Sequence, residues 1–238
     1  MSALITPLHA SLVALEDTQK VTHVELLQAN SGQYISLKVS SALAPNDQQA
    51  MSTFAKDLGV SLVCQQNDVE DLWLNGNSAT LSYQVFAKES GQAINLGFSV
   101  HDFVQVNAKV NQGMIDQAIQ WLAPEAGDQV LDLFSGVGNF SLPIASMADQ
   151  QVTLLALEGD YAMVKQGRTN AMENGLALVD FEQSDLFDES ARKKWQKKAF
   201  NKVLLDPPRA GAKGLAKLLK GQPLERVVYV SCNPASMA

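Results

Sequence analysis

The stretch DLFSGVGNFSLPIA, residues 132–145, decides the fold of this chain. It overlaps the nearly all-apolar run QVLDLF, residues 129–134, which predicts a buried strand. Gly136 and Gly138 then permit a tight turn and a close approach of the backbone to a ligand. A helix is expected from about Asn139. A strand, a glycine turn and a helix in this order predict the first unit of a parallel sheet with a binding site at its edge.

The rest of the second half continues this alternation. Further strands are expected at VTLLALE, LVDFEQ, KVLLDP and RVVYVS, with a helix over residues 160–173, an Arg/Lys-rich helix and a short helix between them. A helix over residues 107–123 precedes the first strand, and one apolar stripe is expected on it: Val110, Met114, Ile115, Ala118, Ile119 and Leu122. Apolar strands that alternate with helices predict a parallel sheet covered on both faces.

The first hundred residues have a different pattern. HVELLQA and QYISLKV flank Asn-Ser-Gly and predict a hairpin. DQQAMSTFAKDLG predicts a helix that stops at its glycine, and the strand-like runs VSLVC, WLNGNSATLSYQVFA and AINLGFSV follow. We therefore expect a small mixed α+β domain over residues 1–100 and an α/β domain of the Rossmann-like type over residues 101–238.

Composition limits the classes of function. The 238 residues carry a formal net charge of −7, which argues against a large basic surface that holds nucleic acid by phosphate contacts alone. No apolar run approaches the roughly 20 residues of a membrane span, and MSALITPLHA lacks the basic start of a signal peptide. A cytoplasmic protein without a membrane partner is expected. Cys64 and Cys232 lie far apart and outside any CxxC pair, so neither a disulfide framework nor a metal site is indicated.

Acidic residues at successive strand ends indicate a cofactor. Asp132 precedes the glycines, and the GxG spacing lacks the third glycine of a dinucleotide site, so the motif suits a cationic ligand better than a phosphate. Glu158 ends the second strand, where a carboxylate can accept both hydroxyls of a ribose. Asp185 follows the third strand and is placed to meet an adenine amino group. S-adenosylmethionine fits this set best. The alternative is that these are solvated strand ends beside an ordinary turn.

A second group follows the fourth and fifth strands. In LLDPPRAG, residues 204–211, two prolines stiffen the loop, so Asp206 and Arg209 are presented in a fixed geometry beside the cofactor. The alternative is an ordinary helix entry with prolines in its first turn. The last strand places Cys232 at the same edge of the sheet. A lone cysteine there is either an inert buried residue or a nucleophile, and Arg209 is a candidate to stabilise its thiolate.

These motifs together resemble a known family. The set consists of FVQVN at 103–107, DLFSGVGNFSLPIA, LEG at 157–159, LLDPPRAG and YVSCNP at 229–234. It resembles the RNA 5-methyluridine (uracil-C5) methyltransferases, and HVELLQANSG resembles the branch that modifies uracil-1939 of 23S ribosomal RNA. The resemblance implies a nucleophilic role for Cys232. It also implies an S-adenosylmethionine site lined by Gln105, Phe134, Asn139, Glu158, Asp185 and Asp206.

The family resemblance implies a reaction as well. The Cys232 thiolate would add to C6 of a uridine in 23S ribosomal RNA, and the activated C5 would receive the methyl group. Asp206 and Arg209 would hold the uracil edge and stabilise the developing charge. One alternative is a non-catalytic module that binds S-adenosylmethionine or RNA. Another is an RNA cytosine-C5 methyltransferase, which the Pro208-Arg209 pair disfavours because that chemistry uses a cysteine directly after the proline.

The resemblance further implies a longer parent protein. In the family a glutamate after the SCNP segment acts as the base, and no residue of this chain matches it. An RNA-binding barrel and the cysteine ligands of a 4Fe–4S cluster precede the matching region. We therefore expect an internal fragment that acts as a monomer, with residues 1–100 contacting the RNA substrate.

Two further features have modest expectations. The run RKKWQKK, residues 192–198, is either an RNA-contacting helix with Trp195 stacked on a base or a solvated helix face anchored by that tryptophan. Cys64 lies in an apolar strand and is expected in a core.

Overall fold

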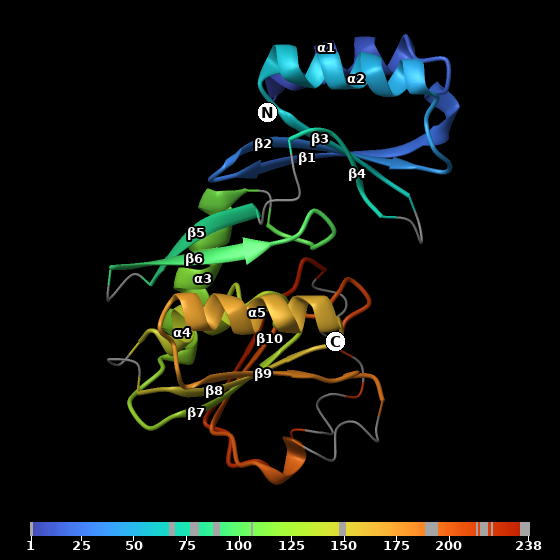
Figure 1. Cartoon of the computed structure of the whole chain (residues 1–238). Coiled ribbons are helices and arrows are strands. Elements are labelled where there is room, and N and C mark those ends of the chain that lie inside the picture. The colour runs from blue at the N-terminus through green and yellow to red at the C-terminus, as the bar shows by residue number, and fades with distance from the viewer. Residues whose placement is uncertain are drawn as a thin grey trace. The chain divides into compact units, whose positions relative to one another are not determined.

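The protein consists of two compact units in the computed structural model, Met1–Ser82 and Tyr83–Ala238 (Figure 1). The structure describes residues 2–66, 70–76, 81–87, 91–105, 107–147, 151–188, 195–212, 214, 219 and 221–233. The contacts divide the chain after Ser82, so the segment from Tyr83 to residue 100 belongs to the second unit. The expected domain boundary at residue 100 stays a prediction.

The first unit is built on a mixed sheet. Its elements are α1 (Ser2–Val13), η1 (Thr18–Lys20), β1 (Val21–Ala29), β2 (Gly32–Val39), α2 (Pro45–Leu58), β3 (Ser61–Gln65) and β4 (Leu72–Asn75). The sheet order is β1-β2-β3-β4. β1 and β2 form the predicted antiparallel hairpin, whereas β2 and β3 are parallel because α2 provides the crossover between them. The predicted glycine stop of α2 is confirmed at Gly59, which is left-handed with φ 66°.

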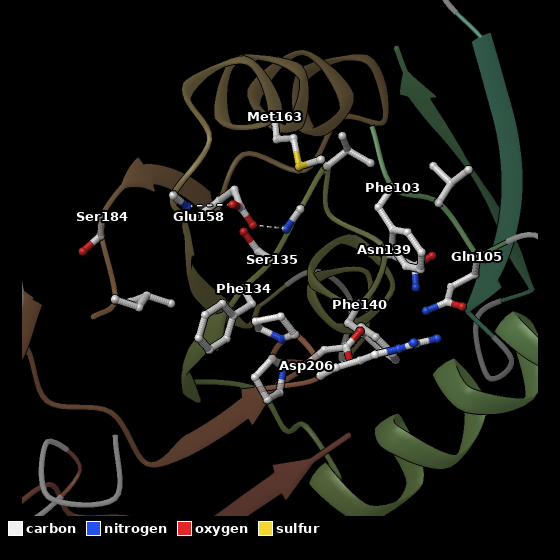
Figure 2. A pocket seen from close by; sticks show the side chains of 18 of the residues that line it. Phe103, Gln105, Phe134, Ser135, Asn139, Phe140, Glu158, Met163, Ser184 and Asp206 are labelled. Carbon is white, nitrogen blue, oxygen red and sulfur yellow. Dashed lines mark hydrogen bonds between the residues drawn. The ribbon is translucent and has the colours of Figure 1, made fainter. Parts of the chain in front are cut away.

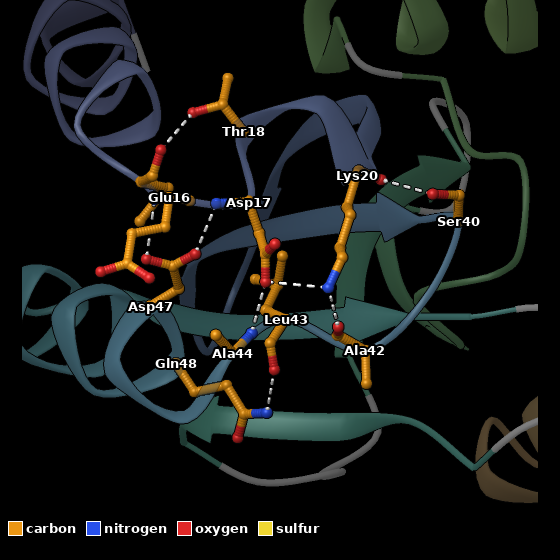
Figure 3. A network of polar contacts seen from close by, with 11 residues as sticks. Glu16, Asp17, Thr18, Lys20, Ser40, Ala42, Leu43, Ala44, Asp47 and Gln48 are labelled. Atoms are coloured by element: carbon orange, nitrogen blue, oxygen red, sulfur yellow. Dashed lines mark hydrogen bonds and ion pairs between the residues drawn. The ribbon is translucent and has the colours of Figure 1, made fainter.

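Two aspartates bind the start of α2 to the turn after α1 (Figure 3). Asp47 is buried and accepts the backbone N–H groups of Glu16 and Asp17 at 3.1 and 2.9 Å. Asp17 in turn accepts the ammonium of Lys20 at 2.9 Å and the backbone N–H of Ala44 at 2.8 Å. These two donors lower the pKa of Asp17 below its ordinary value. Helix α1, which the sequence pattern did not predict, is thereby attached to the rest of the unit.

The second unit contains the predicted parallel sheet. The described strands are β7 (Gln129–Leu133), β8 (Thr153–Glu158), β9 (Val179–Gln183), β10 (Lys202–Leu205) and β11 (Arg226–Tyr229), and all their pairings are parallel. Their order is β11-β10-β7-β8-β9. The chain builds outward from β7 to β9, then returns to the other side of β7 with β10. The carboxyl ends of β7 and its neighbour β10 therefore form a topological switch point, where such sheets bind ligands.

Helices and a hairpin complete the second unit. They are β5 (Leu81–Ala87, of which the part from Tyr83 belongs to this unit), β6 (Gln92–Phe98), α3 (Ala108–Leu122), α4 (Ser141–Ala145), α5 (Tyr161–Glu173) and η3 (Trp195–Lys197). On α3 the predicted stripe is buried at Ile115, Ala118, Ile119 and Leu122, but Val110 is 55% exposed, so the buried part of the stripe starts one turn later. The expected α/β architecture with a Rossmann-like parallel sheet is confirmed.

A buried ion pair fixes β10 beside β7 at the end of the sheet away from the glycine loop. The ammonium of Lys202 contacts the carboxylate of Asp128 and the carbonyl oxygen of Ala123, and only 3% of the lysine side chain is exposed. Asn201 also donates to Asp128. Burial acts to raise the pKa of Asp128, but the hydrogen bonds from Lys202 and Asn201 outweigh it and lower that pKa. The pair stabilises the alignment of β10 with β7, and the loop after β10 therefore begins next to the end of β7.

Two expectations concern the segment before β10. Trp195 is only 1% exposed and packs in the core beneath the sheet, so the prediction that it stacks on an RNA base is wrong. The alternative, an anchoring tryptophan, is confirmed. The start of the Arg/Lys-rich helix and most of the short helix expected before β11 lie outside the described residues.

Candidate cofactor and catalytic site

A cavity of about 860 Å³ lies at the carboxyl ends of the parallel strands in the second unit (Figure 2). Cavities of this size suit a ligand as large as a nucleoside derivative. Nine of the residues singled out in the sequence line it: Gln105, Phe134, Gly136, Asn139, Glu158, Asp185, Asp206, Arg209 and Cys232. Side chains from both sides of the switch point thus face one space.

The loop after β7 is held in a defined conformation. Phe134 is a non-glycine residue in the left-handed region, with φ 66°, and Gly136 has φ 54°. The N–H groups of Phe134 and Ser135 both donate to the carbonyl oxygen of Leu157, at 3.0 and 3.1 Å. These bonds satisfy the backbone of the turn and hold the Phe134 side chain on the cavity wall.

Glu158 is linked to this loop by its carboxylate. Its Oε2 accepts the N–H of Gly136 at 2.9 Å, and its Oε1 accepts those of Gly159 and Asp160 at 2.7 and 3.0 Å. Figure 2 shows the first two bonds. The protein's own backbone therefore fixes the side chain, and Oε2 keeps one lone pair that can accept a hydroxyl group. A Cβ at Gly136 would meet nothing within 4 Å, so its positive φ rather than a close contact accounts for the glycine.

Two residues of the motif lie behind the cavity wall. Asp132 is 1% exposed and its Oδ2 accepts the hydroxyl of Ser141, the first residue of α4. Gly138 has φ 103°, and a Cβ there would approach Leu142 and Phe181 to 3.0 Å. Neither Asp132 nor Gly138 lines the cavity. Both residues support the loop instead: Asp132 bonds to α4, and Gly138 packs against α4 and β9.

Two carboxyl groups near the cavity, the buried one of Asp132 and the half-buried one of Asp206, have raised pKa values. Burial raises the pKa of Asp132 to about 7, opposed by the hydrogen bond from Ser141 and reinforced by the charges of Asp206 and Glu158. Burial also raises the pKa of Asp206 to about 6. One Asp132 oxygen has no hydrogen-bond partner among the described residues. These carboxyl groups therefore hold a proton more readily than exposed ones do.

The loop after β10 brings Asp206 and Arg209 to the cavity. The N–H of Asp206 donates to the carbonyl oxygen of Leu133 at 3.3 Å, so the loop starts in contact with the end of β7. Pro207 is buried and Pro208 and Arg209 are exposed, which places the arginine at the open side of the cavity. The charge of Arg209 is available to an anionic or carbonyl-bearing ligand.

Cys232 lies at the same wall and is exposed. The strand ladder reaches just past β11, where the N–H of Val230 donates to the carbonyl oxygen of Leu205 at 2.8 Å. Ser231 and Asn233 then close a turn through their hydroxyl and backbone groups. Cys64, in contrast, is buried in β3 as predicted, and burial raises the pKa of its thiol to about 11. Only Cys232 combines exposure with a position in the cavity.

Aromatic side chains line the part of the cavity near Asp185. The rings of Phe134 and Phe187 lie 5.8 Å apart at 48°. The carboxylate of Asp185 accepts the N–H of Phe187 at 2.8 Å, which orders the turn after β9. The hydroxyl of Ser135 is buried on this wall without a partner among the described residues. An aromatic ring face beside an unpaired hydroxyl suits a nucleobase.

Sequence reasoning missed several cavity residues. Met163 lines it from the first turn of α5, three residues after Asp160, and its position shortly after a strand end could have indicated this. Tyr83 also lines it, from β5, and its hydroxyl donates to Asn139 at 3.0 Å. No local pattern pointed to Tyr83, because its partner lies 56 residues away. Within the described ranges there is no group of three His, Cys, Asp or Glu side chains that could hold a metal ion, and no helix is long and apolar enough to cross a membrane.

Fold and site define the class of protein. A solved structure from Streptococcus mutans, described as a candidate SAM-dependent methyltransferase, matches 96% of this chain and 66% of its own with a TM-score of 0.51 at 13% identity. The second unit has the Rossmann-like fold of SAM-dependent methyltransferases. The sequence pattern of the tRNA (uracil-5-)-methyltransferases matches residues 2–238, and the chain belongs to that family.

Curated relatives agree with the family. A Shewanella halifaxensis protein named 23S rRNA (uracil(1939)-C(5))-methyltransferase RlmD is 40% identical over 238 residues, all of this chain and 52% of that protein. Proteins of the same name from Shewanella frigidimarina and Salmonella typhimurium are 42% and 39% identical and are covered to 52% and 53%. The chain thus spans about half the length of the curated relatives that it matches.

Proposed function

We propose that this chain carries the methyl-transfer site of an enzyme that methylates C5 of a uridine in 23S ribosomal RNA, with S-adenosylmethionine as cofactor. Family membership and the names of the relatives support the reaction class. The observation that carries the proposal is the position of the exposed Cys232 in the same cavity as Glu158 and Asp206. With ribosomal RNA as its substrate, the protein would act in the cytoplasm as a monomer, without a membrane partner.

The cavity residues fit the cofactor. Glu158, fixed by three backbone N–H groups, would accept one ribose hydroxyl through Oε2. Asp185 and the Phe134 ring would hold the adenine, and Gln105 and Asn139 would contact the remaining polar atoms. S-adenosylmethionine supplies an electrophilic methyl group when bound. Asp132 would act indirectly, since its carboxyl group lies behind the loop next to Ser141.

Cys232 would activate the uracil ring. Its thiolate would add to C6, forming a sulfur–carbon bond while the ring electrons move toward the O4 carbonyl and C5. C5 would then form a bond to the methyl carbon of S-adenosylmethionine while the methyl–sulfur bond breaks, and S-adenosylhomocysteine would leave. Arg209 and Asp206 are placed to hold the uracil edge, and the arginine charge would stabilise the enolate oxygen. Loss of the C5 proton to a base, for which we assign no residue, would expel the thiolate and restore the ring.

The nucleophile is tested with RNA that carries 5-fluorouridine at the target position. Fluorine at C5 cannot leave as a proton, so the covalent adduct should accumulate and shift the protein on a denaturing gel. Cys232→Ala should abolish the adduct, because no thiolate remains to attack C6. Its affinity for S-adenosylmethionine, measured by calorimetry, should stay within about twofold, since no cofactor hydrogen bond to the thiol is proposed.

Cys64→Ala is the matched control, because Cys64 is a buried thiol in the other compact unit. This variant should form the adduct as the unmodified chain does. An adduct that persists in Cys232→Ala would overturn the nucleophile assignment. If the unmodified chain binds S-adenosylmethionine but neither forms the adduct nor transfers a methyl group, the alternative of a non-catalytic binding module is correct.

A further inference from the structure

Asn139 is the centre of a hydrogen-bonded group that joins three elements of the second unit. Its Oδ1 accepts the hydroxyl of Tyr83 at 3.0 Å and the Nδ2 group of Asn111 at 2.8 Å. Its own Nδ2 donates back to Oδ1 of Asn111 at 2.9 Å. Tyr83 comes from β5, Asn111 from α3 and Asn139 from the loop after β7. None of the three lies near another in the sequence.

The hydrogen-bonding capacity of Asn139 is nearly used up. An amide oxygen has two lone pairs, and both are occupied here, by Tyr83 and by Asn111. The amide nitrogen has two protons, of which one goes to Asn111. One N–H is left, and Asn139 lines the cavity (Figure 2). The amide can therefore act toward a ligand as a donor and has no acceptor capacity left.

The two partners are themselves held firmly. Asn111 is 1% exposed, within the buried face of α3. The Tyr83 ring packs edge-on against Phe98, with centroids 5.7 Å apart. Loss of solvation, together with the nearby charge of Asp102, raises the pKa of Tyr83, so its hydroxyl stays protonated and able to donate at neutral pH. A free asparagine amide can turn over and exchange its oxygen and nitrogen, but turning Asn139 over would set its oxygen against the Asn111 oxygen and its nitrogen against the Asn111 nitrogen.

We propose that Tyr83 and Asn111 are positioning residues for the cofactor: they lock the Asn139 amide so that it offers a single N–H to an oxygen acceptor of S-adenosylmethionine. The inference rests on the proposed function, since it takes that cofactor as the ligand. It extends the site to the β5–β6 hairpin and to α3, which carry no part of the glycine motif. The lock contributes by removing the alternative orientation of the amide before binding.

The test measures the dissociation constant of S-adenosylmethionine by calorimetry with the 238-residue chain. Tyr83→Phe keeps the ring and removes one bond to the Asn139 oxygen, so binding should weaken about fivefold, as expected for one neutral hydrogen bond. Asn111→Asp replaces the donor to that oxygen by a carboxylate oxygen. In either orientation the Asn139 oxygen would then face a carboxylate oxygen, so the pair would no longer fix one orientation of the amide, and binding should weaken about tenfold or more.

Gln112→Ala is the matched control. The Gln112 side chain also joins α3 to the hairpin, through the N–H and carbonyl oxygen of Phe86 at 2.9 and 2.7 Å, but it does not contact Asn139. This variant should lower the melting temperature while the dissociation constant stays unchanged. If Tyr83→Phe and Asn111→Asp behave in the same way, with lower melting temperatures and unchanged affinity, their role is structural only and the inference is overturned.

A measurement without cofactor separates this inference from the proposed function. The two Asn139 side-chain amide protons, observed by NMR, should exchange with solvent more slowly in the unmodified chain than in Tyr83→Phe, because the lock restricts the amide. Equal exchange in both would refute the lock. A chain that shows slow exchange but does not bind S-adenosylmethionine would refute the proposed cofactor and leave the lock in place.

Discussion

At the scale of the residue, the buried carboxyl group of Asp132 has the largest effect on pH dependence. The pKa of about 7 lies well above the value near 4 that the same group has in an unfolded chain. Between these two values the folded chain holds a proton that the unfolded chain releases. Stability contributed by this group is therefore fully present below pH 4 and is lost as the pH rises toward 7, at about 1.4 kcal/mol per pH unit.

Asp132→Asn should remove this dependence. Relative to the unmodified chain, the variant should gain free energy of unfolding steadily between pH 4 and pH 7 and then level off, because only the unmodified chain loses the bound proton. Urea unfolding followed from pH 4 to pH 8 gives the difference directly. Asp180→Asn, at an exposed position of β9, is the control and should run parallel to the unmodified chain. A constant difference for Asp132→Asn would contradict the assigned protonation.

At the scale of the element, helix α5 packs closely against the sheet at Gly167. A Cβ at this position would lie 2.4 to 2.8 Å from ring atoms of Phe181 on β9. Phe181 is fully buried, so its ring has little room to move. The absence of a side chain at position 167 allows α5 to pack against the strand whose end carries Asp185.

Gly167→Ala should destabilise the second unit by about 1–3 kcal/mol, because the added methyl group forces α5 or Phe181 to shift. Gly113→Ala makes the same exchange in α3, where nothing lies within 4 Å of the added atom. There the lower flexibility of alanine in the unfolded chain should stabilise by about 0.5–1 kcal/mol. Thermal unfolding of the two variants provides the comparison, and equal effects would contradict the packing argument.

Elements could be predicted where the signal was local. Apolar runs predicted the strands β7 to β11. The acidic residues after those strands predicted that Glu158, Asp185 and Asp206 line one cavity, because side chains at the carboxyl ends of parallel strands lie close together. Contacts distant in sequence could not be predicted. Asn111 meets Asn139 across 28 residues, and the inward turn of Asp132 toward Ser141 depends on how α4 packs.

At the scale of the whole molecule, the two compact units have separate hydrophobic cores. One core consists of residues from Leu4 to Leu74, and the others lie entirely within the second unit. The cavity belongs to the second unit alone. Cores without shared residues can unfold in separate steps, and a ligand stabilises only the unit that binds it.

Differential scanning calorimetry should therefore resolve two transitions. Asp47→Ala removes the acceptor of two backbone N–H groups in the first unit. It should lower the free energy of unfolding of that unit by about 1–3 kcal/mol and shift only its transition to lower temperature. S-adenosylmethionine at 100 times its dissociation constant should raise the free energy of unfolding of the second unit alone, by about 2.7 kcal/mol. That second transition should be the one that Gly167→Ala lowers. A single transition that responds to all three changes would show that the units unfold together.

The loop after β7 has a consequence for the speed of binding. Its turn is closed by two bonds to Leu157, and Glu158 accepts the N–H of Gly136. Encounter with the cofactor then requires no slow rearrangement of these groups. The association rate should accordingly rise in proportion to cofactor concentration without reaching a plateau, and differences in affinity among loop variants should arise in the dissociation rate.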